Sequence, residues 1–152
     1  MSAVIDEPTH PRILMIEDNP GDIAWLRHAL NLQGAPYELV LLADGEMALR
    51  FVDEHRTGKH KPDPCVILLD LYLPKYDGLE VLRAIKRAPV LAHIHVVVLC
   101  GTASPVEEAE ILALGGIYRP KPAVWTHCLE LAAEIFAICH GPRPEMAAGK
   151  SA

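Results

Sequence analysis

Apolar and polar positions alternate in blocks along the chain. Five short apolar runs are separated by longer segments in which apolar residues recur at helical spacing. The runs cover residues 13–16, 37–42, 65–69, 96–100 and 117–119. Continuous apolar runs of this length predict strands buried on both faces, and regular alternation of strands and helices requires a parallel sheet. The pattern therefore predicts an α/β domain made of five strand–helix units.

Capping residues that mark helix starts follow four of these runs. Asn19-Pro20, Asp44-Gly45, Asp77-Gly78 and Ser104-Pro105 each combine a preferred N-cap residue with proline or glycine. Strict alternation of strands and helices with short loops favours a doubly wound sheet with helices on both faces. The expected strand order is the flavodoxin-like order 2-1-3-4-5. We expect one domain over residues 12–140, a flexible arm at 1–11 and a disordered tail at 141–152. Pro120 predicts that the fifth strand is short or lies at an edge.

Composition excludes some classes of partner and indicates the cellular compartment. The chain has 152 residues, 51% of them hydrophobic, and a formal net charge of -6. This charge argues against direct nucleic-acid binding, which needs a basic surface. No apolar run reaches membrane-helix length and no signal peptide is visible, so we expect a cytoplasmic protein without membrane contact. The four cysteines, at 65, 100, 128 and 139, form no C-x-x-C pair, and we interpret them as reduced, buried thiols.

Charged residues follow several of the predicted strands at their carboxyl ends. Glu17 and Asp18 end the first run, Asp70 ends the third, and Lys121 follows the fifth. In a parallel sheet these ends share one edge, where ligands bind in open α/β folds. Three adjacent carboxylates repel one another unless a cation is present, and carboxylate oxygens are ligands that Mg²⁺ prefers. The sequence thus predicts a Mg²⁺ site beside a lysine, an arrangement suited to a phosphoryl group.

These residues and their spacing resemble the receiver domain of bacterial response regulators. The matching features are Glu17-Asp18-Asn19, Asp70 with Pro74 and Asp77-Gly78, Cys100-Gly101, and Lys121-Pro122. They span almost the whole predicted domain. The run Glu-Asp-Asn-Pro-Gly-Asp after the first strand is similar to single-domain regulators paired with phytochrome-type histidine kinases.

The resemblance implies a role for each site residue. Asp70 would accept a phosphoryl group from a sensor histidine kinase, with Lys121 contacting the phosphoryl oxygens. Asp18, Asp70 and the backbone carbonyl of Tyr72 would bind Mg²⁺, and Glu17 would hold it through water. The Lys121–Pro122 bond would be cis, and Tyr118 would be the aromatic switch residue. Apart from self-phosphorylation and self-dephosphorylation, no enzymatic activity is implied.

The resemblance also implies partners. A downstream protein or a phosphotransfer protein would receive the signal by direct contact. A homodimer through the fourth and fifth helices and the strand between them is a further expectation.

One departure affects the expected switch. Receivers usually carry Thr or Ser at the end of the fourth strand, whereas this chain has Cys100, and a thiol is a poor hydrogen-bond donor. The Gly101 backbone N–H could donate instead, and Thr102 could supply a substitute hydroxyl.

Alternative functions remain open. A degenerate receiver could act as a docking module that needs no phosphorylation. A Mg²⁺-dependent phosphohydrolase usually has a second acid two residues after its nucleophile, and here that residue is Tyr72. A nucleotide-binding fold is less well supported because no glycine-rich loop follows the first strand.

Overall fold

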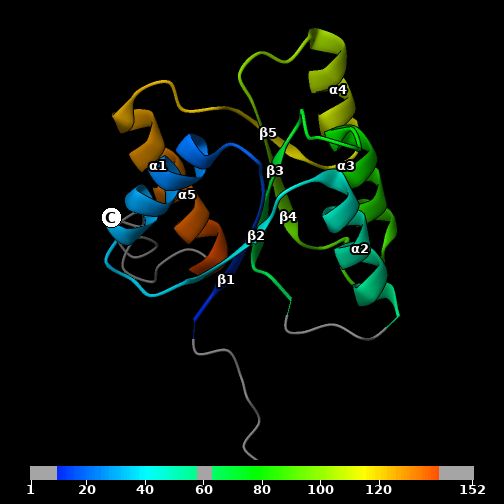
Figure 1. The fold of residues 1–152 in the computed structure, drawn as a ribbon, viewed down its shortest axis with the longest axis horizontal. Helices are drawn as coiled ribbons and strands as arrows, with labels where there is room; N and C mark the ends of the chain where they lie inside the picture. The colour runs from blue at the N-terminus through cyan, green and yellow to red at the C-terminus, as the bar shows by residue number, and fades with distance from the viewer. Residues whose placement is uncertain (1–9, 58–62, 141–152) are drawn as a thin grey trace, which may run out of the picture.

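The computed structural model describes residues 10–57 and 63–140. In this part of the chain five strands alternate with five helices (Figure 1). The elements are β1 Arg12–Ile16, α1 Pro20–Asn31, β2 Glu38–Leu42, α2 Gly45–Arg56, β3 Val66–Asp70, α3 Gly78–Arg87, β4 His95–Cys100, α4 Pro105–Ala113, β5 Ile117–Pro120 and α5 Trp125–His140. The predicted arm and tail fall largely on residues 1–9 and 141–152, outside the described ranges.

The strands form one parallel sheet in the order β2-β1-β3-β4-β5. The predicted α/β fold and its flavodoxin-like order are therefore confirmed. β5 has four residues and lies at the edge, as the proline at position 120 indicated. The central strand β3 is buried along its whole length, which explains why its sequence is apolar without alternation.

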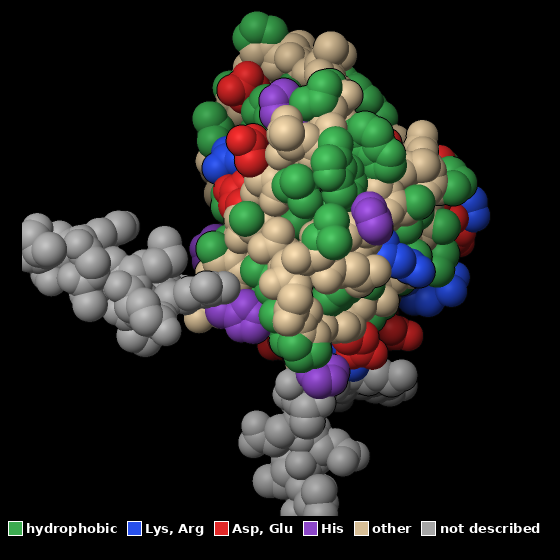
Figure 2. Space-filling model, turned by 90° about the vertical axis from the view of Figure 1, so that its left-hand side faces the viewer, with side chains coloured by type: hydrophobic (Ala, Val, Ile, Leu, Met, Phe, Trp, Pro, Cys, Tyr) green, Lys and Arg blue, Asp and Glu red, His purple; other side chains and the backbone are tan. Residues whose placement is uncertain are grey.

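Helices cover both faces of the sheet. In Figure 1, α1 and α5 lie on one side of the sheet and α2, α3 and α4 on the other. Each side has its own apolar core, and alternate residues of a strand contribute to opposite cores: Leu14 to one and Met15 to the other. Figure 2, which views the side of α1 and α5, shows hydrophobic side chains gathered on that face. Trp25 of α1 is 44% exposed there and packs edge-on against Trp125 of α5.

The predicted caps are present at the helix starts. Asn19 Oδ1 accepts hydrogen bonds from the backbone N–H groups of Gly21 and Asp22. Asp77 caps α3, and Ser104 forms a capping box with Glu107 at the start of α4. These caps fix the turns that leave the carboxyl edge of the sheet, so they also fix the backbone around the acidic residues.

Gly78 is required by a close approach of backbone segments. A Cβ atom at this position would lie 2.5 Å from the carbonyl oxygen of Leu71 and 2.8 Å from that of Asp70. The Gly78 N–H also donates to the Leu71 carbonyl at 3.0 Å. The loop between β3 and α3 thus packs against the strand end that carries Asp70, and only glycine fits there.

The interpretation of all four cysteines as reduced thiols is wrong for two of them. Cys65 and Cys139 form a disulfide, with their Cα atoms 5.1 Å apart. Cys65 immediately precedes β3 and Cys139 lies in the last turn of α5, so the pairing depends on how α5 crosses the sheet. The two residues are 74 positions apart, and no local sequence pattern signals the contact. Cys100 and Cys128 are free and buried, as predicted.

No helix in the described ranges has the length and hydrophobicity that a membrane crossing needs.

Candidate functional site

The candidate site lies at the carboxyl edge of the sheet, where three strands deliver their charged residues. Glu17 follows β1, Asp70 is the last residue of β3, and Lys121 follows β5. Backbone hydrogen bonds continue past the strand ends and hold these positions. The Glu17 N–H donates to the Leu42 carbonyl at 3.0 Å and the Lys121 N–H to the Cys100 carbonyl at 3.1 Å. The predicted convergence of acids and lysine at one edge is therefore present.

Three carboxylates form a compact group that could hold a metal ion. One oxygen from each of Glu17, Asp18 and Asp70 lies within 4.8 Å of the other two. Glu17 and Asp70 are only 2% and 5% exposed, whereas Asp18 is exposed to solvent. A set of carboxylate oxygens open to water on one side suits Mg²⁺, which keeps several of its waters. The donor chemistry therefore fits the predicted cofactor.

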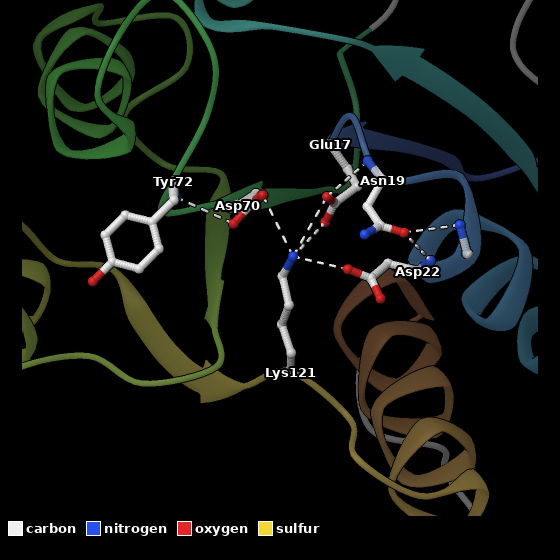
Figure 3. Close-up of polar contacts among 7 residues, drawn as sticks. Glu17, Asn19, Asp22, Asp70, Tyr72 and Lys121 are labelled. Carbon is white, nitrogen blue, oxygen red and sulfur yellow. Dashed lines mark hydrogen bonds and ion pairs between the residues drawn. The ribbon is translucent and has the colours of Figure 1, made fainter.

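The Lys121 side chain points its ammonium at the two buried carboxylates of this group, Glu17 and Asp70 (Figure 3). Its Nζ lies 3.4 Å from Asp70 Oδ2 and 3.3 Å from Glu17 Oε1. Its shortest contact, at 2.8 Å, is with Asp22 Oδ2 of α1. The single ammonium thus balances carboxylates from α1, β3 and the end of β1.

The charges in the site change the proton affinities of two groups. Burial and the neighbouring charge of Asp70 raise the pKa of Glu17 to about 7, although the Asn19 N–H and Lys121 act in the other direction. Burial opposes the charge of Lys121, but Asp22, Glu17 and Asp70 outweigh it and hold the pKa of the ammonium above its usual value. The lysine stays charged, while the buried glutamate readily takes up a proton.

Asp70 also neighbours the end of β4, where it pairs with Leu99. Cys100 is fully buried there, and Gly101 and Thr102 are exposed in the following loop. A Cβ atom added to Gly101 would meet open space. Thr102 contributes its backbone carbonyl to a hydrogen bond from Tyr72. The structure therefore places all three residues beside the site without assigning the switch to any of them.

The Tyr72 side chain spans the gap between the loop after β3 and the loop after β4. Its hydroxyl donates to Glu107 Oε1 at 3.0 Å and lies 3.3 Å from the Thr102 carbonyl oxygen. The Tyr72 backbone N–H donates to Asp70 Oδ1 at 3.2 Å. The hydrogen bond to Glu107 and partial burial raise the pKa of Tyr72 to about 12, so the phenol remains a donor. One residue thus contacts both Asp70 and the capping box of α4.

Two further predictions concern Tyr118 and the Lys121–Pro122 bond, and the structure tests only the second. Tyr118 is half-buried and packs against the core that α2, α3 and α4 share with the sheet, three residues before Lys121. No peptide bond in the described ranges is cis, so the prediction of a cis Lys121–Pro122 bond is wrong. The trans form is intrinsically favoured before proline, and here the Lys121 N–H still continues the ladder to β4.

Sequence reasoning missed two roles at this site. Asp22 enters the sequence analysis only as the last residue of the run Glu-Asp-Asn-Pro-Gly-Asp, and Tyr72 only through its backbone carbonyl. Asp22 lies four residues after Asp18, in the first turn of the helix that leaves the same sheet edge, so its position could have marked it as a neighbour of Lys121. The reach of the Tyr72 ring to Glu107, 35 residues away, has no local signal.

Comparison with protein families shows which family the chain belongs to. Residues 13–118 match the model of the response regulator receiver domain. The chain belongs to this family. Lys121 lies just beyond the matched residues, and the structure places it beside the carboxylates of Glu17 and Asp70.

Individual relatives are regulatory proteins. Response regulator Rcp1 of Synechocystis sp. is 42% identical over 95 residues, which cover 62% of this receiver chain and 65% of Rcp1. A probable methanogenesis regulatory protein, FilR2 of Methanothrix harundinacea, is 40% identical over 92 residues, covering 60% of this chain and 59% of FilR2. The matches thus span less than two thirds of either relative.

Solved structures share the fold over most of the receiver. The phosphorylated cyanobacterial phytochrome response regulator RcpA superposes with a TM-score of 0.77 at 32% identity, covering 88% of this chain and 96% of RcpA. The Mn²⁺-bound form of Rcp1 gives 0.73 at 32% identity, covering 84% and 92%. The bacteriophytochrome response regulator AtBRR gives 0.67 at 34% identity, covering 86% and 95%.

Proposed function

We propose that this chain is a response regulator whose Asp70 accepts a phosphoryl group from a sensor histidine kinase in a Mg²⁺-dependent reaction. The observation that carries the proposal is the convergence of two buried carboxylates, one exposed carboxylate and one ammonium at the carboxyl edge of the sheet. Membership of the receiver family and similarity to a phosphorylated relative support it.

The transfer step needs a nucleophile and charge stabilisation. An oxygen of the Asp70 carboxylate attacks phosphorus, a P–O bond forms, and the P–N bond to the donor imidazole breaks with its electron pair returning to the ring. A carboxylate is a weak nucleophile, so positioning and charge stabilisation provide most of the rate. Asp70 is held by the N–H of Tyr72, and Lys121 lies 3.4 Å from it, where it can pair with the phosphoryl oxygens.

Glu17, Asp18, Asp70 and the Tyr72 carbonyl are the residues we assign to Mg²⁺. When bound, the ion supplies positive charge that offsets the negative charge developing on the transferred group. The Mn²⁺-bound form of Rcp1 supports a divalent ion as the cofactor of this chain. Without the ion, Lys121 partly neutralises the same carboxylates, so metal and lysine act on a shared set of charges.

The relatives support a choice of kinase. Similarity to regulators of phytochromes and bacteriophytochromes favours a phytochrome-type histidine kinase as the donor. We assign the output to direct contact with a downstream protein or a phosphotransfer protein.

Intact mass after incubation with Mg²⁺ and acetyl phosphate tests the proposal. We expect one phosphate adduct on the wild type and none on Asp70→Asn. Asp77→Asn is the matched control, because it removes a carboxylate from the same loop while asparagine remains a good N-cap; it should be phosphorylated like the wild type.

The same experiment separates the alternatives. If the wild type gains no adduct although Mg²⁺ raises its melting temperature, the phosphorylation-independent docking module is favoured. Cys100 in place of the usual hydroxyl is the feature that supports that alternative. Turnover of a phosphate ester such as p-nitrophenyl phosphate in excess of the protein would instead indicate a phosphohydrolase.

A further inference from the structure

Asp22 is the nearest anionic partner of Lys121, although it lies outside the acidic group that could bind a metal. The distance from Asp22 Oδ2 to Lys121 Nζ is 2.8 Å, compared with 3.3 Å for Glu17 and 3.4 Å for Asp70. Asp22 comes from the first turn of α1, held by the Asn19 cap that accepts its backbone N–H. Figure 3 shows the Lys121 ammonium between the carboxylates of Asp70 and Asp22, with Glu17 on the same side of the ammonium as Asp22.

The environment of Asp22 differs from that of the two buried acids. Its side chain is 43% exposed, whereas Glu17 and Asp70 have exposed fractions of 2% and 6%. A lysine ammonium has three N–H donors, and Asp22 occupies one of them at the best hydrogen-bonding distance. A phosphoryl group on Asp70 needs donors from the same nitrogen.

We propose that Asp22 is a positioning residue that holds Lys121 before phosphorylation and competes with the phosphoryl oxygens for its ammonium. The proposal rests on the proposed phosphoacceptor function of Asp70. The Asp22 charge would disfavour a second anion on the far side of the lysine and so would lower the affinity of the site for a phosphoryl group. Without that charge, Lys121 would be free to bind Asp70 and the phosphoryl oxygens more closely.

This arrangement has opposite consequences for metal and phosphoryl binding. In Asp22→Asn, the released ammonium interacts more strongly with Glu17 and Asp70 and competes better with Mg²⁺. The same ammonium binds a phosphoryl analogue more strongly. If the substitution merely loosened the loop, the affinities for Mg²⁺ and for the phosphoryl analogue would both fall. A fall in one affinity and a rise in the other therefore identifies the competition.

Calorimetric titrations with Mg²⁺ alone, and with beryllofluoride at saturating Mg²⁺, test the proposal. For Asp22→Asn we expect beryllofluoride affinity to rise about three- to fivefold and Mg²⁺ affinity to fall about twofold, as for the loss of one partly exposed charge pair. Asp22→Glu, which restores the carboxylate, should bring both affinities back towards the wild type.

Glu46→Gln is the matched control. Glu46 also lies in the first turn of a helix, and its carboxylate pairs with Lys75 at 2.8 Å, with 50% of the side chain exposed. Its loss removes the same formal charge and should leave both affinities unchanged. Unchanged or weaker beryllofluoride binding by Asp22→Asn overturns the proposal for Asp22. A wild type that binds no beryllofluoride overturns the phosphoacceptor function itself.

Discussion

The two sides of Asp70 are built from different chemistry. On one side, the carboxylates of Asp70, Glu17 after β1 and Asp22 of α1 lie 2.8–3.4 Å from the Lys121 ammonium, so charge dominates. On the side of β4, a buried thiol replaces the expected hydroxyl, and the Tyr72 phenol connects the loop after β3 to Glu107. The first side contains the groups that we propose bind a phosphoryl ligand, and the second contains the contacts that would transmit its presence to α4. The difference suggests that acceptance and transmission can be altered separately.

The largest expected effect comes from removing the cation on the charged side. Lys121→Ala should lower the rate of phosphorylation by acetyl phosphate at least about 100-fold, as for the loss of a group that stabilises transition-state charge. The same variant should bind Mg²⁺ more tightly, because the ammonium no longer competes for Glu17 and Asp70. Mass spectrometry measures the rate and calorimetry the affinity. A phosphorylation rate close to that of the wild type would mean that the charged side does not govern acceptance.

An intermediate effect follows from the raised pKa of Glu17. Because the folded state binds this proton more tightly than the unfolded chain, Glu17 contributes stability at pH values below about 4.5 that is lost as the pH rises through about 7. In the absence of metal, the melting temperature should therefore fall across this range by a few degrees more in the wild type than in Glu17→Gln. Mg²⁺ should stabilise the wild type increasingly as the pH rises, because the ion requires the carboxylate. Parallel pH profiles for the two proteins would contradict this.

The smallest expected effect lies on the side of β4. Tyr72→Phe removes a hydroxyl that donates to Glu107, and because this hydrogen bond is exposed to solvent its loss should lower the free energy of unfolding only slightly. Hydrogen exchange should quicken at the first turn of α4, while the rate of phosphorylation stays within about twofold of the wild type, because the Tyr72 N–H and carbonyl remain. A tenfold change in that rate would show that the two sides of Asp70 are coupled.

Sequence patterns predicted most of the charged residues around Asp70, because these residues lie at the ends of strands. Glu17, Asp18, Asp70 and Lys121 each follow an apolar run, and parallel pairing brings such ends to one edge whatever the details of packing. Asp22 and the Tyr72 hydroxyl were missed because their partners lie 99 and 35 residues away and depend on side-chain reach. The roles of Cys100, Gly101, Thr102 and Tyr118 in switching stay predictions.

The disulfide between Cys65 and Cys139 has a mechanical consequence. It closes a covalent loop that contains β3, β4 and β5 with the helices between them and most of α5. If the chain is stretched from its two ends in a force experiment, the tension bypasses this loop, and only the segments outside it lengthen. Adding a reductant would release the loop and increase the contour length at rupture, so a single pulling curve would report whether the bond is closed.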